Sequence, residues 1–270
     1  MRHLIGFILT VCVFTAHAGS MAGGAPSFPP EQIIRFAKQV EKTLAAQGAR
    51  VAILGRVGRP ASEMPEGMHF THVSFAVYSS ITTADGRTLP GYAIYNLYQR
   101  NEKPDTSSLI QDFPVDFFAG VAELQAGLLI PSPELQRRLL QVIDSPTYRK
   151  LHDPRYSAIA NPYTLGRQNC TEHTLDVINA AIYQTDDIRR IKAAEKKYFD
   201  AQTVNVSGLE LALGAIFSSE ITLSDQPGKP VTATFETIAN YLKKYDAGSQ
   251  MYIITPDTEA PQTRSHHESE

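Results

Sequence analysis

The stretch from Gln168 to His173 constrains the fold most, because it starts a helix and carries a cysteine. Asn169 and Glu172 have the spacing of a capping box, in which Asn169 caps the helix and Glu172 reaches back to the amide of Asn169. Cys170 is then the first helical residue. The predicted helix is amphipathic. Its apolar stripe consists of Cys170, Thr174, Leu175, Val177, Ile178, Ala181 and Ile182, and its other side of Glu172, Asp176, Asn179 and Tyr183. The Cys170 stripe is therefore expected to pack against another layer of structure.

The position of Cys170 favours a reactive thiol. Unpaired amides at a helix start stabilise negative charge, so we expect the pKa of this thiol to lie below the value of about 8.5 for an ordinary one. Removal of a signal peptide would take away Cys12 and leave Cys170 as the remaining cysteine of an exported protein. A buried structural cysteine is the alternative interpretation.

The first 18 residues have the pattern of a secretory signal peptide. Arg2 and His3 precede an apolar run over 4–14, and Ala16-His17-Ala18 supplies a small-x-small cleavage site. We expect cleavage after Ala18 and a periplasmic or secreted protein. No later stretch has about 18 consecutive apolar residues, so we expect no transmembrane segment after signal removal.

Four regions are expected along the chain. They are a signal peptide over 1–18, a flexible leader over 19–30 rich in Gly, Ala, Ser and Pro, a single domain over 31–255, and a polar tail over 256–270. A hydrophobic content of 43% over 270 residues is enough for a sizeable core. The net charge is -3 and there is no basic stripe, which argues against nucleic acid as a partner.

The segment 70–78 alternates in the manner of a strand, with His72, Ser74 and Ala76 on one face. Short side chains beside a histidine permit close approach of a helix, and the Cys170 stripe is also rich in short side chains. This match predicts that the Cys170 thiol and the His72 imidazole meet. A hydrogen-bonded core histidine is the alternative.

A second strand is expected over 91–100, with Asn96 on the same face as Tyr92, Ile94 and Tyr98. If this strand pairs with the His72 strand, Asn96 is placed to orient His72. A solvated amide at a sheet edge is the other interpretation of Asn96.

The remaining elements follow from periodicity, caps and turn residues. Helices are expected over 31–47, 133–143, 186–202, 207–217 and 234–245, strands over 50–54, 221–223 and 251–255, and loops over 55–68, 101–108 and 146–168. Phe113, Phe117 and Phe118, around Pro114, are expected in the core, although they also suit the apolar wall of a substrate groove.

Several chemistries lack their motifs. The chain has no serine-hydrolase elbow, phosphate-binding glycine loop or Cys-x-x-Cys pair. His69 and His72 would lie on opposite faces of a strand, so no shared metal ion is expected. His173 lies about 60° around the helix from Cys170, and we expect it to be structural.

Two sets of motifs carry a resemblance to known families. Thr71-His72-Val73-Ser74-Phe75-Ala76-Val77 ahead of Asn169-Cys170-Thr171-Glu172-His173 resembles the permuted papain-like cysteine enzymes, which include NlpC-type peptidases and the lecithin:retinol acyltransferase group. The latter group has Asn-Cys-Glu-His at its nucleophile, whereas this chain has Thr171 after the cysteine. The runs 91–98, 112–118 and 168–176 more closely resemble the bacterial domain of unknown function 2145 family, over nearly the whole mature chain.

The papain-like resemblance implies an α+β fold with a circularly permuted antiparallel sheet against which the Cys170 helix packs. It implies Cys170 as nucleophile, His72 as general base and Asn96 as orienting residue. The Cys170 amide, with Gln168 or Tyr163, would bind the oxyanion. The expected reaction is acyl transfer or hydrolysis at an amide or ester of a cell-envelope small molecule, peptide or lipid, without a cofactor. A non-catalytic binding or structural module that kept the fold is the alternative.

Overall fold

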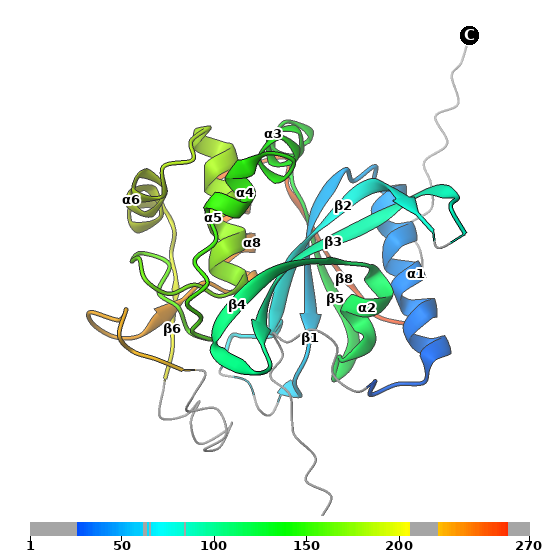
Figure 1. Cartoon of the computed structure of the whole chain (residues 1–270), viewed down its shortest axis with the longest axis horizontal. Coiled ribbons are helices and arrows are strands. Elements are labelled where there is room, and N and C mark those ends of the chain that lie inside the picture. Colours follow the sequence, from blue (N-terminus) through cyan, green and yellow to red (C-terminus); the bar gives the residue numbers. More distant parts are fainter. Residues whose placement is uncertain (1–25, 62–63, 65, 84, 206–220, 259–270) are drawn as a thin grey trace, which may run out of the picture.

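A computed structural model describes residues 26–61, 64, 66–83, 85–205 and 221–258. Within this part of the chain, six strands form one antiparallel sheet in the order β4-β3-β2-β1-β5-β8, with helices against both faces (Figure 1). The strands are β1 (Val51–Val57), β2 (His72–Thr82), β3 (Thr88–Arg100), β4 (Lys103–Asp112), β5 (Glu123–Ile130) and β8 (Gln250–Ile254). The mixed α+β class and the antiparallel sheet expected from the sequence are confirmed.

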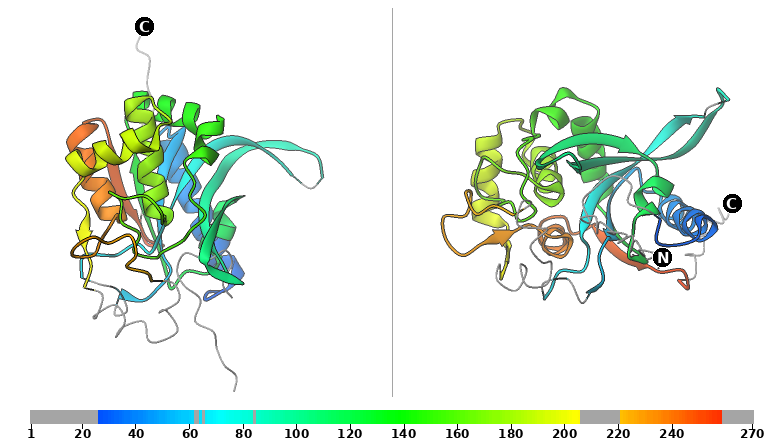
Figure 2. Two further views of the ribbon diagram at one scale, coloured as in Figure 1. Left: turned by 60° about the vertical axis from the view of Figure 1, so that its left-hand side comes forward. Right: turned by 60° about the horizontal axis from the view of Figure 1, so that its bottom comes forward.

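The two faces of the sheet bury different residues, because side chains alternate along each strand. One face, here called the α1 face, carries Ala52, Leu54, Ala76, Tyr92 and Ile94. The other, here called the α5 face, carries Val51, Ile53, Val73, Phe75 and Val77. Strand β1 is buried along its whole length, since both faces are covered. The far end of β2 and the start of β3 project as a hairpin from the body of the molecule (Figure 2).

Two helices cover the α1 face, α1 (Pro30–Ala46) and α2 (Pro114–Ala119). Helix α1 has proline at its first position and buries one stripe of apolar residues, as the sequence predicts. Phe36 of α1 meets Phe118 of α2 edge to face, with ring centroids 4.9 Å apart. Phe117 and Phe118 are fully buried, as expected for the core, whereas Phe113 is 41% exposed.

The α5 face is covered by several helices. They are α3 (Pro133–Ile143), α4 (Pro146–Lys150), α5 (Cys170–Tyr183), α6 (Ile188–Tyr198) and α8 (Phe235–Tyr245). Leu175, Val177 and Ile178 of α5 belong to the same buried cluster as Val73 and Phe75 of β2. Helix α5 therefore packs directly on the sheet, and α6 packs on α5 from the outside (Figure 1).

Gly55 of β1 and Gly127 of β5 are paired across the sheet on this face. They leave room for two aromatic rings, because a Cβ at Gly127 would lie 2.6 Å from Phe235 Cζ and 2.8 Å from Phe70 Cζ. The ring centroids of Phe70 and Phe235 are 4.6 Å apart. The glycine pair thus seats α8 against the sheet.

Some predicted elements are wrong. Most of 101–108 belongs to β4, an edge strand whose polar, partly exposed residues give no apolar alternation. Strand β5 was not predicted, and α4 lies within the predicted loop over 146–168. Residues 221–223 are not in a strand. The short strands β6 (Gln202–Thr203) and β7 (Val231–Thr232) pair with each other instead.

Other predictions fall outside the described residues. These are the signal peptide over 1–18, the helix over 207–217, the leader before residue 26 and the tail beyond residue 258. In the part of the chain that the structure describes, no helix combines the length and apolar character needed to cross a membrane.

Candidate functional site

Helix α5 begins as predicted. Asn169 has an extended backbone conformation, and its Oδ1 accepts the amide hydrogen of Glu172 at 2.9 Å. The reverse contact of a capping box is not made, because the Glu172 carboxylate binds Lys192 instead. Cys170 is the first helical residue, is 3% exposed, and packs with Leu97 and Tyr156. The thiol is therefore in the layer between α5 and the sheet.

His72 lies on the opposite face of the sheet from Cys170. Its ring is 5.7 Å from that of Phe117 in α2, and its neighbour Val73 points into the core beneath α5. Leu97, which contacts Cys170, alternates in β3 with Asn96, which contacts His72. The predicted meeting of the Cys170 thiol and the His72 imidazole is therefore wrong. The alternation of side chains along β2 was predicted correctly. The face that carries His72 packs against the α1 side of the molecule, however, and not against α5.

The structure does bring His72 and Asn96 together, since β2 and β3 pair as expected. His72 Nε2 and Asn96 Oδ1 are 3.1 Å apart, and Asn96 Nδ2 donates to Asp112 Oδ1 at 2.7 Å. Tyr98 donates its hydroxyl hydrogen to Asp112 Oδ2 at 2.9 Å, and its ring stacks on His72 at 4.9 Å. Because the Asn96 amino group points at Asp112, its carbonyl oxygen faces His72, and His72 must carry its proton on Nε2.

The electrostatics of this network keep His72 neutral. Burial lowers the pKa of His72 well below its ordinary value, and the positive charge of Arg56 lowers it further, while the hydrogen bond with Asn96 opposes both effects. Burial also raises the pKa of Asp112 to about 6, against the lowering effects of Tyr98, Arg56 and Asn96. His72 is fully buried. The arrangement is that of a core histidine hydrogen-bonded through Nε2, the alternative interpretation given above, while its Nδ1 has no hydrogen-bond partner among the described residues.

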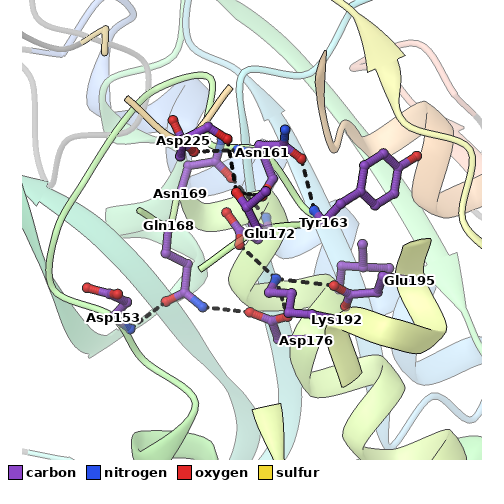
Figure 3. Close-up of polar contacts among 12 residues, drawn as sticks. Asp153, Asn161, Tyr163, Gln168, Asn169, Glu172, Asp176, Lys192, Glu195 and Asp225 are labelled. Atoms are coloured by element: carbon purple, nitrogen blue, oxygen red, sulfur yellow. Dashed lines mark hydrogen bonds and ion pairs between the residues drawn. The ribbon is translucent and has the colours of Figure 1, made fainter. Parts of the chain in front are cut away.

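Gln168 and Tyr163, predicted to bind an oxyanion, have their polar atoms engaged elsewhere. Gln168 donates to Leu151 O and Asp176 Oδ2 and accepts from the Asp153 amide. The Tyr163 hydroxyl donates to Phe199 O at 2.8 Å and accepts from the Ala201 amide at 2.8 Å. Both side chains hold loops in place, and Figure 3 shows the contacts of Gln168 with Asp153 and Asp176.

A buried cluster of charges lies on the outer side of α5, the side opposite the apolar stripe. Lys192 Nζ of α6 is 2.7 Å from Glu172 Oε1, 2.6 Å from Asp176 Oδ1 and 3.1 Å from Glu195 Oε2 (Figure 3). All four side chains are at most 7% exposed. The sequence contained a signal for this cluster, because Glu172 and Asp176 are four apart and Lys192 and Glu195 three apart, which puts each pair on one helix face. The prediction missed that α6 covers α5 here.

A cavity of about 420 Å³ borders this cluster. It lies between α5, α6 and the segments 150–155 and 164–168. Glu172, Asp176 and Lys192 belong to its lining, together with His152, Arg155 and Arg167. A volume of this size is typical of sites for small ligands.

Two further histidines lie on the α5 side of the sheet. His152 Nε2 is 2.9 Å from Ser107 Oγ, and its ring centroid is 6.0 Å from that of His173. Burial lowers the pKa of His152, and burial lowers the pKa of His173 to about 3, with His152 and Lys192 adding to the effect. His173 also packs edge to face against Tyr148 at 4.9 Å, in keeping with the structural role predicted for it.

Among the described residues, no group of three or more His, Cys, Asp and Glu side chains is arranged to hold a metal ion. His69 lies near Gln125, away from His72.

Comparison with known proteins gives one match. Residues 43–242 match the family model described as an uncharacterized protein conserved in bacteria, DUF2145. No curated protein and no solved structure matches the chain.

Proposed function

This chain belongs to the DUF2145 family, and we propose that it is a non-catalytic binding protein in which Cys170 is a packed structural residue. The observation that carries the proposal is the separation of Cys170 and His72 by the sheet. A general base must lie within about 2.6–3.2 Å of the proton that it removes. His72, on the opposite face of the sheet from Cys170, does not meet this requirement.

The cavity beside Lys192 is the proposed binding site. It combines a volume of about 420 Å³ with charged and amide groups from α5, α6 and two loops. Such groups fix the orientation of a bound polar molecule. Gln168 ties the loops to α5 through Leu151, Asp153 and Asp176, so the wall of the site is held rigidly before a ligand arrives.

We also propose that the protein is exported and that its fold descends from the papain-like enzymes. A basic start, an apolar run and Ala16-His17-Ala18 support export to the periplasm or beyond. A helix-start cysteine packed on an antiparallel sheet supports the common descent. N-terminal sequencing of protein from the cell envelope tests export, and an intact Met1 contradicts it.

Alkylation of Cys170 by iodoacetamide tests the binding proposal. The rate is followed against pH by mass spectrometry of the peptide that carries Cys170, in wild type and in His72→Ala. We expect slow alkylation with superimposable profiles and no turnover of a model ester. A shift of the His72→Ala profile to higher pH, together with ester turnover by wild type, contradicts the proposal.

A second candidate function, cysteine hydrolase or acyltransferase, is favoured by one observation. His152 lies on the Cys170 side of the sheet, since Ser107, its partner, shares a strand face with Leu109, which packs near Cys170. In this alternative, His152 replaces His72 as base. Ester turnover that is lost in both Cys170→Ala and His152→Ala but retained in His72→Ala supports the alternative and rejects the binding proposal.

A further inference from the structure

The buried cluster at the cavity has more negative than positive groups. Lys192 supplies one ammonium, and Glu172, Asp176 and Glu195 supply three carboxyl groups. Asp225 lies close enough to act electrostatically on Glu172, on the side away from Lys192 (Figure 3). Burial raises the pKa of Glu172 and Glu195 well above their ordinary values. The site therefore favours uptake of a proton or of another positive group.

Two carboxylate oxygens of the cluster, Glu172 Oε2 and Glu195 Oε2, lack a hydrogen-bond partner among the described residues, and of these two residues Glu172 lines the cavity. Lys192 donates hydrogen bonds to Glu172 Oε1 and Asp176 Oδ1 and forms an ion pair with Glu195 Oε2. The second oxygen of Asp176 accepts from Gln168, and the other oxygen of Glu195 accepts from Asn179. Glu172 Oε2, in a side chain that is 1% exposed, has no hydrogen-bond partner among the described residues. A buried acceptor left without a donor is unfavourable, so a donor from a ligand would be bound strongly there.

The cavity gives a ligand access to this position. Glu172 lines it at the end formed by α5 and α6, whereas Arg155 and Arg167 line it from the loops. Arg155 is 61% exposed and pairs with Asp153. Negative groups are therefore buried at one end of the cavity, and guanidinium groups lie along the loop wall.

We propose that this cavity binds a small zwitterion, with its ammonium donating to Glu172 Oε2 and its carboxylate toward Arg155 and Arg167. The inference rests on the proposed binding function and names its ligand class. A primary ammonium has N–H donors and no acceptor, so it can supply the donor that Glu172 Oε2 lacks. Planar guanidinium groups match a carboxylate. An anion alone would meet the repulsion of the acidic end.

Isothermal titration calorimetry of the full-length chain with three matched probes tests the inference. The probes are γ-aminobutyrate, butylamine and butyrate. We expect γ-aminobutyrate to bind best, butylamine more weakly, and butyrate not at all. Equal binding of butyrate and γ-aminobutyrate, or binding of none of the three, overturns the inference.

Variants assign the binding to the proposed groups. Glu172→Gln should weaken binding of γ-aminobutyrate about tenfold or more, because it removes a charge-assisted hydrogen bond. Glu134→Gln makes the same chemical change at an exposed position of α3 and should leave binding unchanged. Arg155→Gln should reduce the preference for γ-aminobutyrate over butylamine. Unchanged binding in Glu172→Gln overturns the inference, and the probe comparison in wild type decides the matter if that variant does not fold. Ester turnover by wild type with loss in Cys170→Ala rejects the binding function itself, which the probe selectivity does not test.

Discussion

His72 Nε2 lies 3.1 Å from Asn96 Oδ1, and the two side chains join β2 to β3 on the α1 face of the sheet. Asn96 is fully buried and also donates to Asp112. Asn96→Ala should lower the free energy of unfolding by about 2–4 kcal/mol, because it leaves the His72 N–H and an Asp112 oxygen without partners. Urea denaturation measures this loss. Asn101→Ala, at an exposed position in the β3–β4 turn, should change stability little. An equal effect of both substitutions would contradict a structural role for the Asn96 network.

Asp112 should titrate near pH 6 in the folded protein, because burial raises the pKa of its carboxyl to about 6. The folded state then holds a proton that the unfolded state, with a carboxyl pKa of about 3.9, releases. Its contribution to stability is fully present below about pH 3.9 and is lost as the pH rises through 6. The loss is at most about 3 kcal/mol. Carbon NMR of the Asp112 carboxyl measures the titration, and a midpoint near or below the ordinary value would contradict the prediction.

Lys192→Met should destabilise the protein by about 3–5 kcal/mol, because it leaves Glu172, Asp176 and Glu195 buried without their shared cation. Lys196→Met is the matched control, on an exposed position of the same helix, and should have little effect. Adding Glu172→Gln to Lys192→Met should recover part of the stability. Thermal denaturation measures the stability of the three variants. An unchanged stability of Lys192→Met would contradict the prediction and show that the carboxyl groups of the cluster are protonated enough to do without the lysine.

Gly127→Ala should lower the free energy of unfolding by about 1–3 kcal/mol, because its Cβ would overlap the Phe235 and Phe70 rings. Gly228→Ala provides the control, since nothing lies within 4 Å of a Cβ built there. Chemical denaturation of both variants tests the prediction. Equal stability of the two would mean that α8 can shift away from the sheet at no cost.

The local elements on either side of the site were predictable from sequence, because their signals are local. The Asn169 cap, the start of α5 at Cys170 and the alternation around His72 are all present. Strand β4 was missed because an edge strand with one exposed side needs no apolar alternation.

The arrangement of layers was not predictable from the same patterns. A strand with both faces buried gives no sign of which face receives which helix, and both faces of β2 offer small or apolar residues. His72 was therefore assigned to the wrong layer. The burial of the acidic side of α5 was not predicted, because its partner, Lys192, lies in another helix and buries the charges by ion pairing.

The burial of Cys170 between α5 and the β3–β4 edge makes the natural thiol a reporter of local motion. Reagent can reach it only when this layer opens, so the labelling rate at neutral pH measures the free energy of that opening. Labelling at the rate of global unfolding would show that the edge, the loop around Tyr156 and α5 separate only when the whole fold is lost. Faster labelling would identify them as an independent unit of unfolding, observable without an engineered probe.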